Sequence, residues 1–213
     1  MPAEFVDAEA VQGHGEGGMH RVPSRTVLGV AVSALVIGGY FLPIWEMQAD
    51  VRGLGMFREP FIHLRISGTG IAGQLESFNR FGRMFGIRPM QPDEFVELRL
   101  FPVAVAAAVA LTLLWAAQGR PWQRWAALLL LWGLPAGALG LTQARLALMA
   151  YTRDPMASYY MDVRDLLLPV FGTKKILGAT VYTRPGPGLL LFVVAALLGT
   201  LVLSRPQKAA KGG

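Results

Sequence analysis

Apolar positions along the chain gather into four long runs that polar stretches separate. The two central runs, 101–118 and 126–143, contain no charged residue. Each is about as long as a helix must be to cross a hydrocarbon core of roughly 30 Å. The connector 119–125 holds two arginines, a proline and two tryptophans, which suit a turn at the level of the lipid headgroups. The pattern therefore predicts a transmembrane helical hairpin.

Two outer runs of similar character predict a further span on each side of this hairpin. We therefore expect an all-α membrane protein with four transmembrane helices, arranged as two hairpins, and with two α+β caps outside the membrane. The expected order is a flexible tail at 1–25, a span at 26–45, a loop at 46–100, a span at 101–118, a turn at 119–125, a span at 126–143, a loop at 144–186, a span at 187–204 and a basic tail at 205–213.

The two long loops carry short patterns of secondary structure that predict folded caps. Apolar residues alternate with polar ones over 61–66, which predicts a strand, and 180–183 has strand-like composition. Residues 71–85 have apolar positions at helical spacing. Glu94 and Glu97 are interpreted as a solvated helix face at the membrane entrance rather than as a catalytic pair.

Composition supports the membrane interpretation. The chain has 53% hydrophobic and 16% charged residues, whereas soluble domains carry about 25% charged residues. The net charge of +6 is typical of cations that flank spans and meet anionic lipid, and we expect no nucleic-acid partner. Cysteine is absent, which excludes disulfides and thiolate metal sites.

Short basic segments set the expected orientation. Arg120 and Arg124 lie in the predicted turn, and the C-terminal tail is basic and free of acid. A raw count of lysine and arginine would instead place the two long loops in the cytoplasm. The positive-inside rule, however, holds best for short segments beside spans. We therefore expect both termini in the cytoplasm and both caps outside.

Two groups of residues are candidates for binding. Small and kinking residues within 126–143 predict tight packing against partner helices; they are Gly133, Pro135, Gly137 and Gly140. A possible copper or haem site would use His63, which is the only histidine of the loops, with Met56 and Met84. The alternative for His63 is a half-exposed residue of a strand without any metal.

Three segments, taken together, resemble a known family. They are Leu42-Pro43-Ile44-Trp45-Glu46-Met47, then Phe81–Met90, then Phe171-Gly172-Thr173-Lys174-Lys175-Ile176-Leu177. They resemble poorly characterised bacterial multi-span membrane proteins that are often encoded near genes for nitrous oxide reductase maturation and copper handling. The resemblance implies a bacterial inner-membrane location and a link to copper or haem.

The chain departs from that family at the positions that would bind metal. The family's two histidines fall on Arg83 and near Tyr151, and a methionine falls on Ile87. The leading hypothesis is therefore a non-catalytic accessory subunit without cofactor, whose partners are membrane lipids and other subunits of a membrane complex. A copper- or haem-handling protein is the alternative, and a small transporter is the third.

Overall fold

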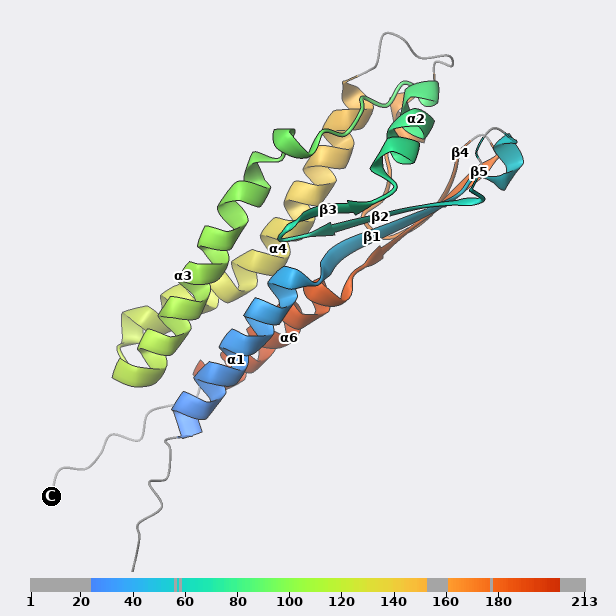
Figure 1. Ribbon diagram of the computed structural model, residues 1–213. Helices are drawn as coiled ribbons and strands as arrows, with labels where there is room; N and C mark the ends of the chain where they lie inside the picture. The colour runs from blue at the N-terminus through green and yellow to red at the C-terminus, as the bar shows by residue number, and fades with distance from the viewer. Residues whose placement is uncertain (1–23, 56, 58, 153–160, 177, 204–213) are drawn as a thin grey trace, which may run out of the picture.

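The computed structural model combines a body of long helices with an antiparallel sheet that continues from one end of it (Figure 1). It describes residues 24–55, 57, 59–152, 161–176 and 178–203. The long helices are α1 (Ser24–Phe41), α3 (Val96–Gln118), α4 (Pro121–Tyr151) and α6 (Pro187–Leu203). Each of these four packs against two of the others, in the cyclic order α1, α3, α4, α6.

The sheet joins segments from both ends of the chain. Its five strands lie in the order β3-β2-β1-β5-β4, and each neighbouring pair is antiparallel. The strands are β1 (Pro43–Asp50), β2 (Phe61–Ser67), β3 (Gly70–Gly73), β4 (Gly172–Ile176) and β5 (Ala179–Pro185). Shorter elements complete the fold; they are η1 (Arg52–Leu54), α2 (Leu75–Phe85), η2 (Pro92–Glu94) and α5 (Val163–Leu166).

One face of the sheet is buried and the other is open, because apolar and polar residues alternate along its central strands. In β1, the side chains of Trp45, Met47 and Ala49 enter the core, whereas Glu46 and Gln48 lie on the opposite face. The buried face packs against phenylalanines of α2, the segment around α5 and the last turns of α4. The apolar contacts of this core therefore hold the sheet to the end of α4.

Local signals explain where the helices of the central hairpin begin and end. Gly119 follows α3 with φ 69° and donates its N–H to the carbonyl of Trp115, which closes the helix. Pro121 begins α4, where a proline costs no internal hydrogen bond. The turn is therefore shorter than the expected 119–125, and α4 also continues beyond the expected end at residue 143.

The expectation of an all-α protein with four transmembrane helices is wrong. The structure contains a five-stranded antiparallel sheet, and α3 and α4 are the helices of the described residues that are long and apolar enough to cross a membrane. α1 and α6 are shorter apolar helices. The reason is visible at residues 43–45, which we assigned to a span but which form the start of β1. The two loops expected as separate caps also pair with each other, through β1 and β5.

Candidate functional site

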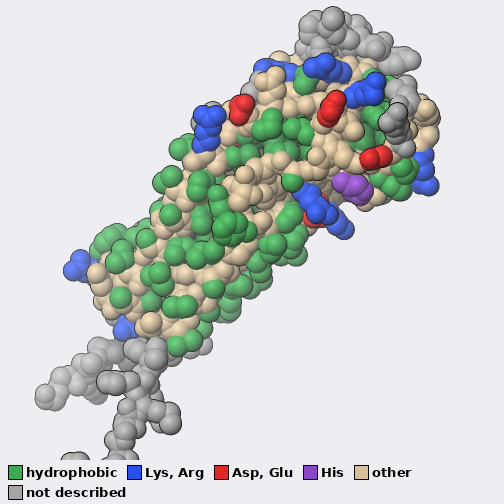
Figure 2. Space-filling model, in the orientation of Figure 1, with side chains coloured by type: hydrophobic (Ala, Val, Ile, Leu, Met, Phe, Trp, Pro, Cys, Tyr) green, Lys and Arg blue, Asp and Glu red, His purple; other side chains and the backbone are tan. Residues whose placement is uncertain are grey.

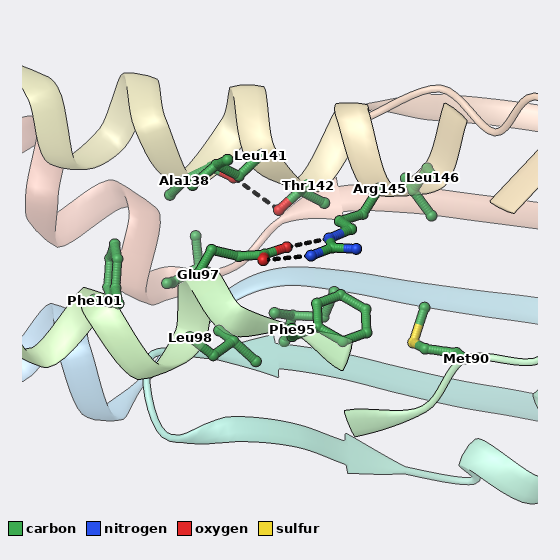
Figure 3. A pocket seen from close by; sticks show the side chains of 12 residues that line it. Met90, Phe95, Glu97, Leu98, Phe101, Ala138, Leu141, Thr142, Arg145 and Leu146 are labelled. Carbon is green, nitrogen blue, oxygen red and sulfur yellow. Dashed lines mark hydrogen bonds and ion pairs between the residues drawn. The ribbon is translucent and has the colours of Figure 1, made fainter. Parts of the chain in front are cut away.

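A groove lies where the helical body meets the sheet. Figure 3 shows side chains of α3 and α4 on its opposite walls, with β1 and β2 beneath. Its lining is almost entirely apolar and includes Ile44, Ile66, Phe95, Phe101, Ala138 and Leu141. A concave, apolar site with a few polar groups is the usual form of a ligand-binding site. We therefore treat this groove as the first candidate.

The charged groups that line the groove form one ion pair. The guanidinium of Arg145 donates from Nε to one carboxylate oxygen of Glu97 and from a terminal nitrogen to the other, the second at 2.7 Å (Figure 3). The side chain of Glu97 is 17% exposed and that of Arg145 is 27% exposed. The guanidinium also lies 5.4 Å from the ring centre of Phe95. This two-point contact fixes the first turn of α3 against α4. The expectation that Glu97 belongs to a solvated helix face is therefore wrong.

Removal of the charge of Glu97 should loosen this junction. We expect Glu97→Gln to lower the free energy of unfolding by about 1.5–3 kcal/mol, the usual range for a hydrogen bond to a charged group. Thermal unfolding in detergent measures the effect. A double-mutant cycle with Arg145→Gln isolates the pair, and an interaction energy near zero would contradict the role given to it.

The four residues predicted to pack against partner helices do not share one face of α4. Pro135 is buried inside the protein. Gly133, Gly137 and Gly140 lie together on the outer side, because positions four and seven residues apart share one face of a helix. A Cβ atom built on any of these three would have no other segment of the described residues within 4 Å. We call this surface the α4 glycine face.

Glycines of α1 and α6, unlike those of α4, lie where two segments of the chain approach closely. A Cβ on Gly29 of α1 would lie 2.7 Å from the Cβ of Ala116 in α3. A Cβ on Gly188 of α6 would lie 2.5 Å from the carbonyl oxygen of Leu42 and 2.6 Å from that of Gly39. These glycines therefore permit contacts within the chain, whereas the α4 glycine face is left uncovered by the described residues.

The open face of the sheet forms a second hollow, of about 690 Å³, lined mainly by polar side chains. At its helix-proximal end, the carboxylate of Glu46 lies between two arginines of the neighbouring strands, 2.6 Å from Arg184 and 3.6 Å from Arg65. Farther out, hydrogen bonds from the guanidinium of Arg52 lower the pKa of Asp50. The hollow therefore contains three arginines and two carboxylates, with a small excess of positive charge.

The candidate metal ligands are not brought together by the described residues. His63 is exposed on the open face of the sheet, at the wall of the polar hollow. Met84 belongs to α2 and packs against the core on the other face. Met56 lies outside the described residues. Among the residues that the structure describes, no group of three histidine, aspartate or glutamate side chains is placed to hold a metal ion. The copper or haem alternative stays a prediction.

Sequence reasoning missed the Glu97–Arg145 pair, although the chain contains a signal for it. Both residues lie equally far along the chain from Pro121, at the start of α4. In an antiparallel hairpin this spacing places them at the same level, and their charges are opposite.

Comparison with known proteins adds no assignment to these surfaces. No family model matches the chain, and no significant match was found among curated proteins or solved structures. The resemblance described from the sequence therefore stays a prediction.

Proposed function

We propose that the protein is a non-catalytic accessory subunit of a membrane complex, which binds a helix of a partner subunit through the α4 glycine face. The observation that carries this proposal is the space beside Gly133, Gly137 and Gly140 that the described residues leave empty, in contrast to Gly29 and Gly188, where a Cβ would meet another segment of the chain. Small residues four apart allow the backbones of two membrane helices to approach closely.

Exposure of the helical body supports a place in the lipid bilayer. In both α3 and α4, only 28% of the most apolar 18-residue stretch is buried within the chain, whereas a core helix of a soluble protein would be mostly buried. Large apolar side chains lie on the surface of these helices, among them Val103, Trp125 and Leu129, the last 75% exposed. Figure 2 shows apolar side chains over the helical body and charged ones gathered mainly at the sheet end.

Basic residues at the other end of the helical body support the orientation. Arg25, Arg120 and Arg124 belong to the end that lies away from the sheet, and the guanidinium of Arg124 lies 4.9 Å from the ring centre of Trp125. Arginine with tryptophan is typical of a membrane interface, and short basic segments favour the cytoplasmic side. In this proposal, α3 and α4 cross the inner membrane of a bacterium and the sheet lies on the periplasmic side, where its polar hollow is available to a partner.

The test compares a substitution on the α4 glycine face with a matched one elsewhere. We expect Gly137→Leu to abolish copurification of a membrane partner in mild detergent, because the added side chain keeps the two helices apart. The unfolding temperature of the protein itself should not fall, since no other segment of the described residues lies within 4 Å of the new Cβ.

The matched control is Ala106→Leu, which adds a similar bulk to an exposed position of α3. We expect this variant to keep the partner. A wild-type protein that purifies as a lone monomer under several detergents would overturn the accessory role, and so would equal loss of the partner in both variants.

A further inference from the structure

We propose that the polar hollow on the open face of the sheet binds an extended acidic segment of a partner protein, whose carboxylates contact arginines at two levels of the sheet. The inference deepens the proposed function: it rests on the accessory role and names the chemistry of the segment that the partner brings to the sheet. The exposure of the charged groups, their spacing and the neutral groups between them support it.

The hollow presents its positive charges to solvent and covers its negative ones. The side chains of Arg52, Arg65 and Arg184 are 60–75% exposed. Those of Glu46 and Asp50, which these arginines contact, are only 14% and 20% exposed. An approaching anion therefore meets guanidinium groups first, whereas a cation is kept from the carboxylates. Charge complementarity favours an acidic ligand.

The carboxylates orient the arginines without using all of their donors. Arg184 contacts Glu46 through Nε and one terminal nitrogen, whereas a guanidinium has five N–H donors. Arg65 lies farther from the same carboxylate, at 3.6 Å. At the outer level, the guanidinium of Arg52 lies 5.2 Å from the ring centre of Phe61, which lines the hollow. Such oriented guanidinium groups suit two-point binding of a further carboxylate.

The two levels of arginine have the spacing of side chains on an extended peptide. Arg65 and Arg184 lie opposite Glu46 on the neighbouring strands. Arg52 holds Asp50, which lies four residues farther along β1 and therefore about 13 Å away. In an extended peptide, side chains four positions apart share one face and are separated by about the same distance. Two acidic residues at this spacing reach both levels, which a compact anion does not.

Neutral polar groups lie between the two levels. Gln48 is paired with His63 on one side and with Tyr182 on the other, and Thr173 lies opposite Tyr182 on β4. All four line the hollow, whose volume of about 690 Å³ is within the usual range for ligand sites, roughly 300–1,000 Å³. Amide and hydroxyl groups suit the backbone of a bound segment, since each N–H and C=O needs a partner when it leaves water.

The test measures peptide binding to the purified full-length protein in an uncharged detergent, by fluorescence anisotropy. The first probe is an eight-residue peptide with glutamate at its second and sixth positions, serine elsewhere and an uncharged dye. The matched probe has its two glutamates at the fourth and fifth positions, so its charge is equal but its carboxylates lie on opposite faces. We expect the matched probe to bind about tenfold more weakly, the loss of one charged hydrogen-bonded contact.

Substitutions in the protein test the arginines themselves. Arg52→Gln and Arg184→Gln should each weaken binding of the first probe about tenfold. Arg80→Gln is the matched control, because Arg80 is exposed on α2, which packs against the other face of the sheet. This variant should bind as the wild type does. Circular dichroism melting shows which variants fold, and Arg52→Gln decides the question if Arg184→Gln does not fold.

Four results would overturn the inference: no binding of the first probe, equal binding of the two probes, unchanged binding by Arg52→Gln, or citrate that binds as tightly as the first probe. Equal binding would mean attraction by net charge alone, and tight citrate binding would mean a site for a small anion. These results leave the accessory role intact, because the peptides are measured on the protein without its partner. A lone monomer that binds the first probe would instead overturn the accessory role.

Discussion

Replacement of Trp45 by alanine is expected to lower the free energy of unfolding by about 3–5 kcal/mol, the usual cost of removing a large aromatic side chain from a core. Trp45 has no exposed surface, and its indole N–H donates to the carbonyl of Val170 at 2.8 Å. It therefore joins β1 to the segment that precedes β4, 125 residues away in the chain. Chemical denaturation in detergent, followed by tryptophan fluorescence of the remaining residues, measures the loss.

Trp45→Phe separates the two contributions of this side chain. It keeps most of the apolar contact but removes the N–H donor, and the carbonyl of Val170 then loses its partner. We expect a smaller cost, about 1–3 kcal/mol, from the unpaired and partly buried carbonyl. A Trp45→Ala variant as stable as the wild type would contradict a buried role and would favour the interfacial position that aromatic residues take beside membrane spans.

Substitution of Gly188 by leucine is expected to separate α1 from α6 and to lower the free energy of unfolding by about 3 kcal/mol, the upper end of overpacking costs. The new Cβ would lie 2.5 Å from the carbonyl oxygen of Leu42 and 2.6 Å from that of Gly39. These are backbone atoms, which cannot rotate away, so one of the helices must move. Thermal unfolding in detergent measures the effect.

Alanine substitutions at Gly137 and Gly188 form a control pair, because their expected effects on stability have opposite signs. Gly137→Ala should stabilise the helix by up to about 1 kcal/mol, because alanine has the better helix propensity and the site is open. Gly188→Ala should destabilise the protein, because even a methyl group meets the backbone of α1. If both variants stabilise, the close crossing of α1 and α6 is wrong.

Periodic and compositional patterns were enough to locate most of the secondary structure. The strand expected at 61–66 is confirmed as β2, and the strand-like segment at 180–183 lies within β5. The apolar runs coincide with α1, α3, α4 and α6, apart from their ends. Such patterns are local, since each residue type prefers a conformation and a side of its own element. They could not show which strands pair.

The first expected span shows where local pattern fails. Residues 26–45 are apolar almost throughout, but α1 ends at Phe41 and Pro43 begins β1. An apolar strand inside a core and the last turn of a membrane helix have the same composition, and only the partner decides between them. Here the partners are β2 and β5, which pair with β1 on its two sides, and Trp45 lies in the core on the buried face of the sheet.

Some features of the candidate surfaces can likewise be predicted from local sequence, and others depend on the fold. Residue order alone places Gly133, Gly137 and Gly140 on one side of a helix and shows that 101–118 and 126–143 contain no charged residue. The folded arrangement was needed to show that the described residues leave this side uncovered, that Pro135 lies inside, and that Glu97 contacts Arg145 at the groove. This difference arises because helical periodicity is a property of the backbone, whereas exposure and ion pairing depend on segments that are distant in the chain.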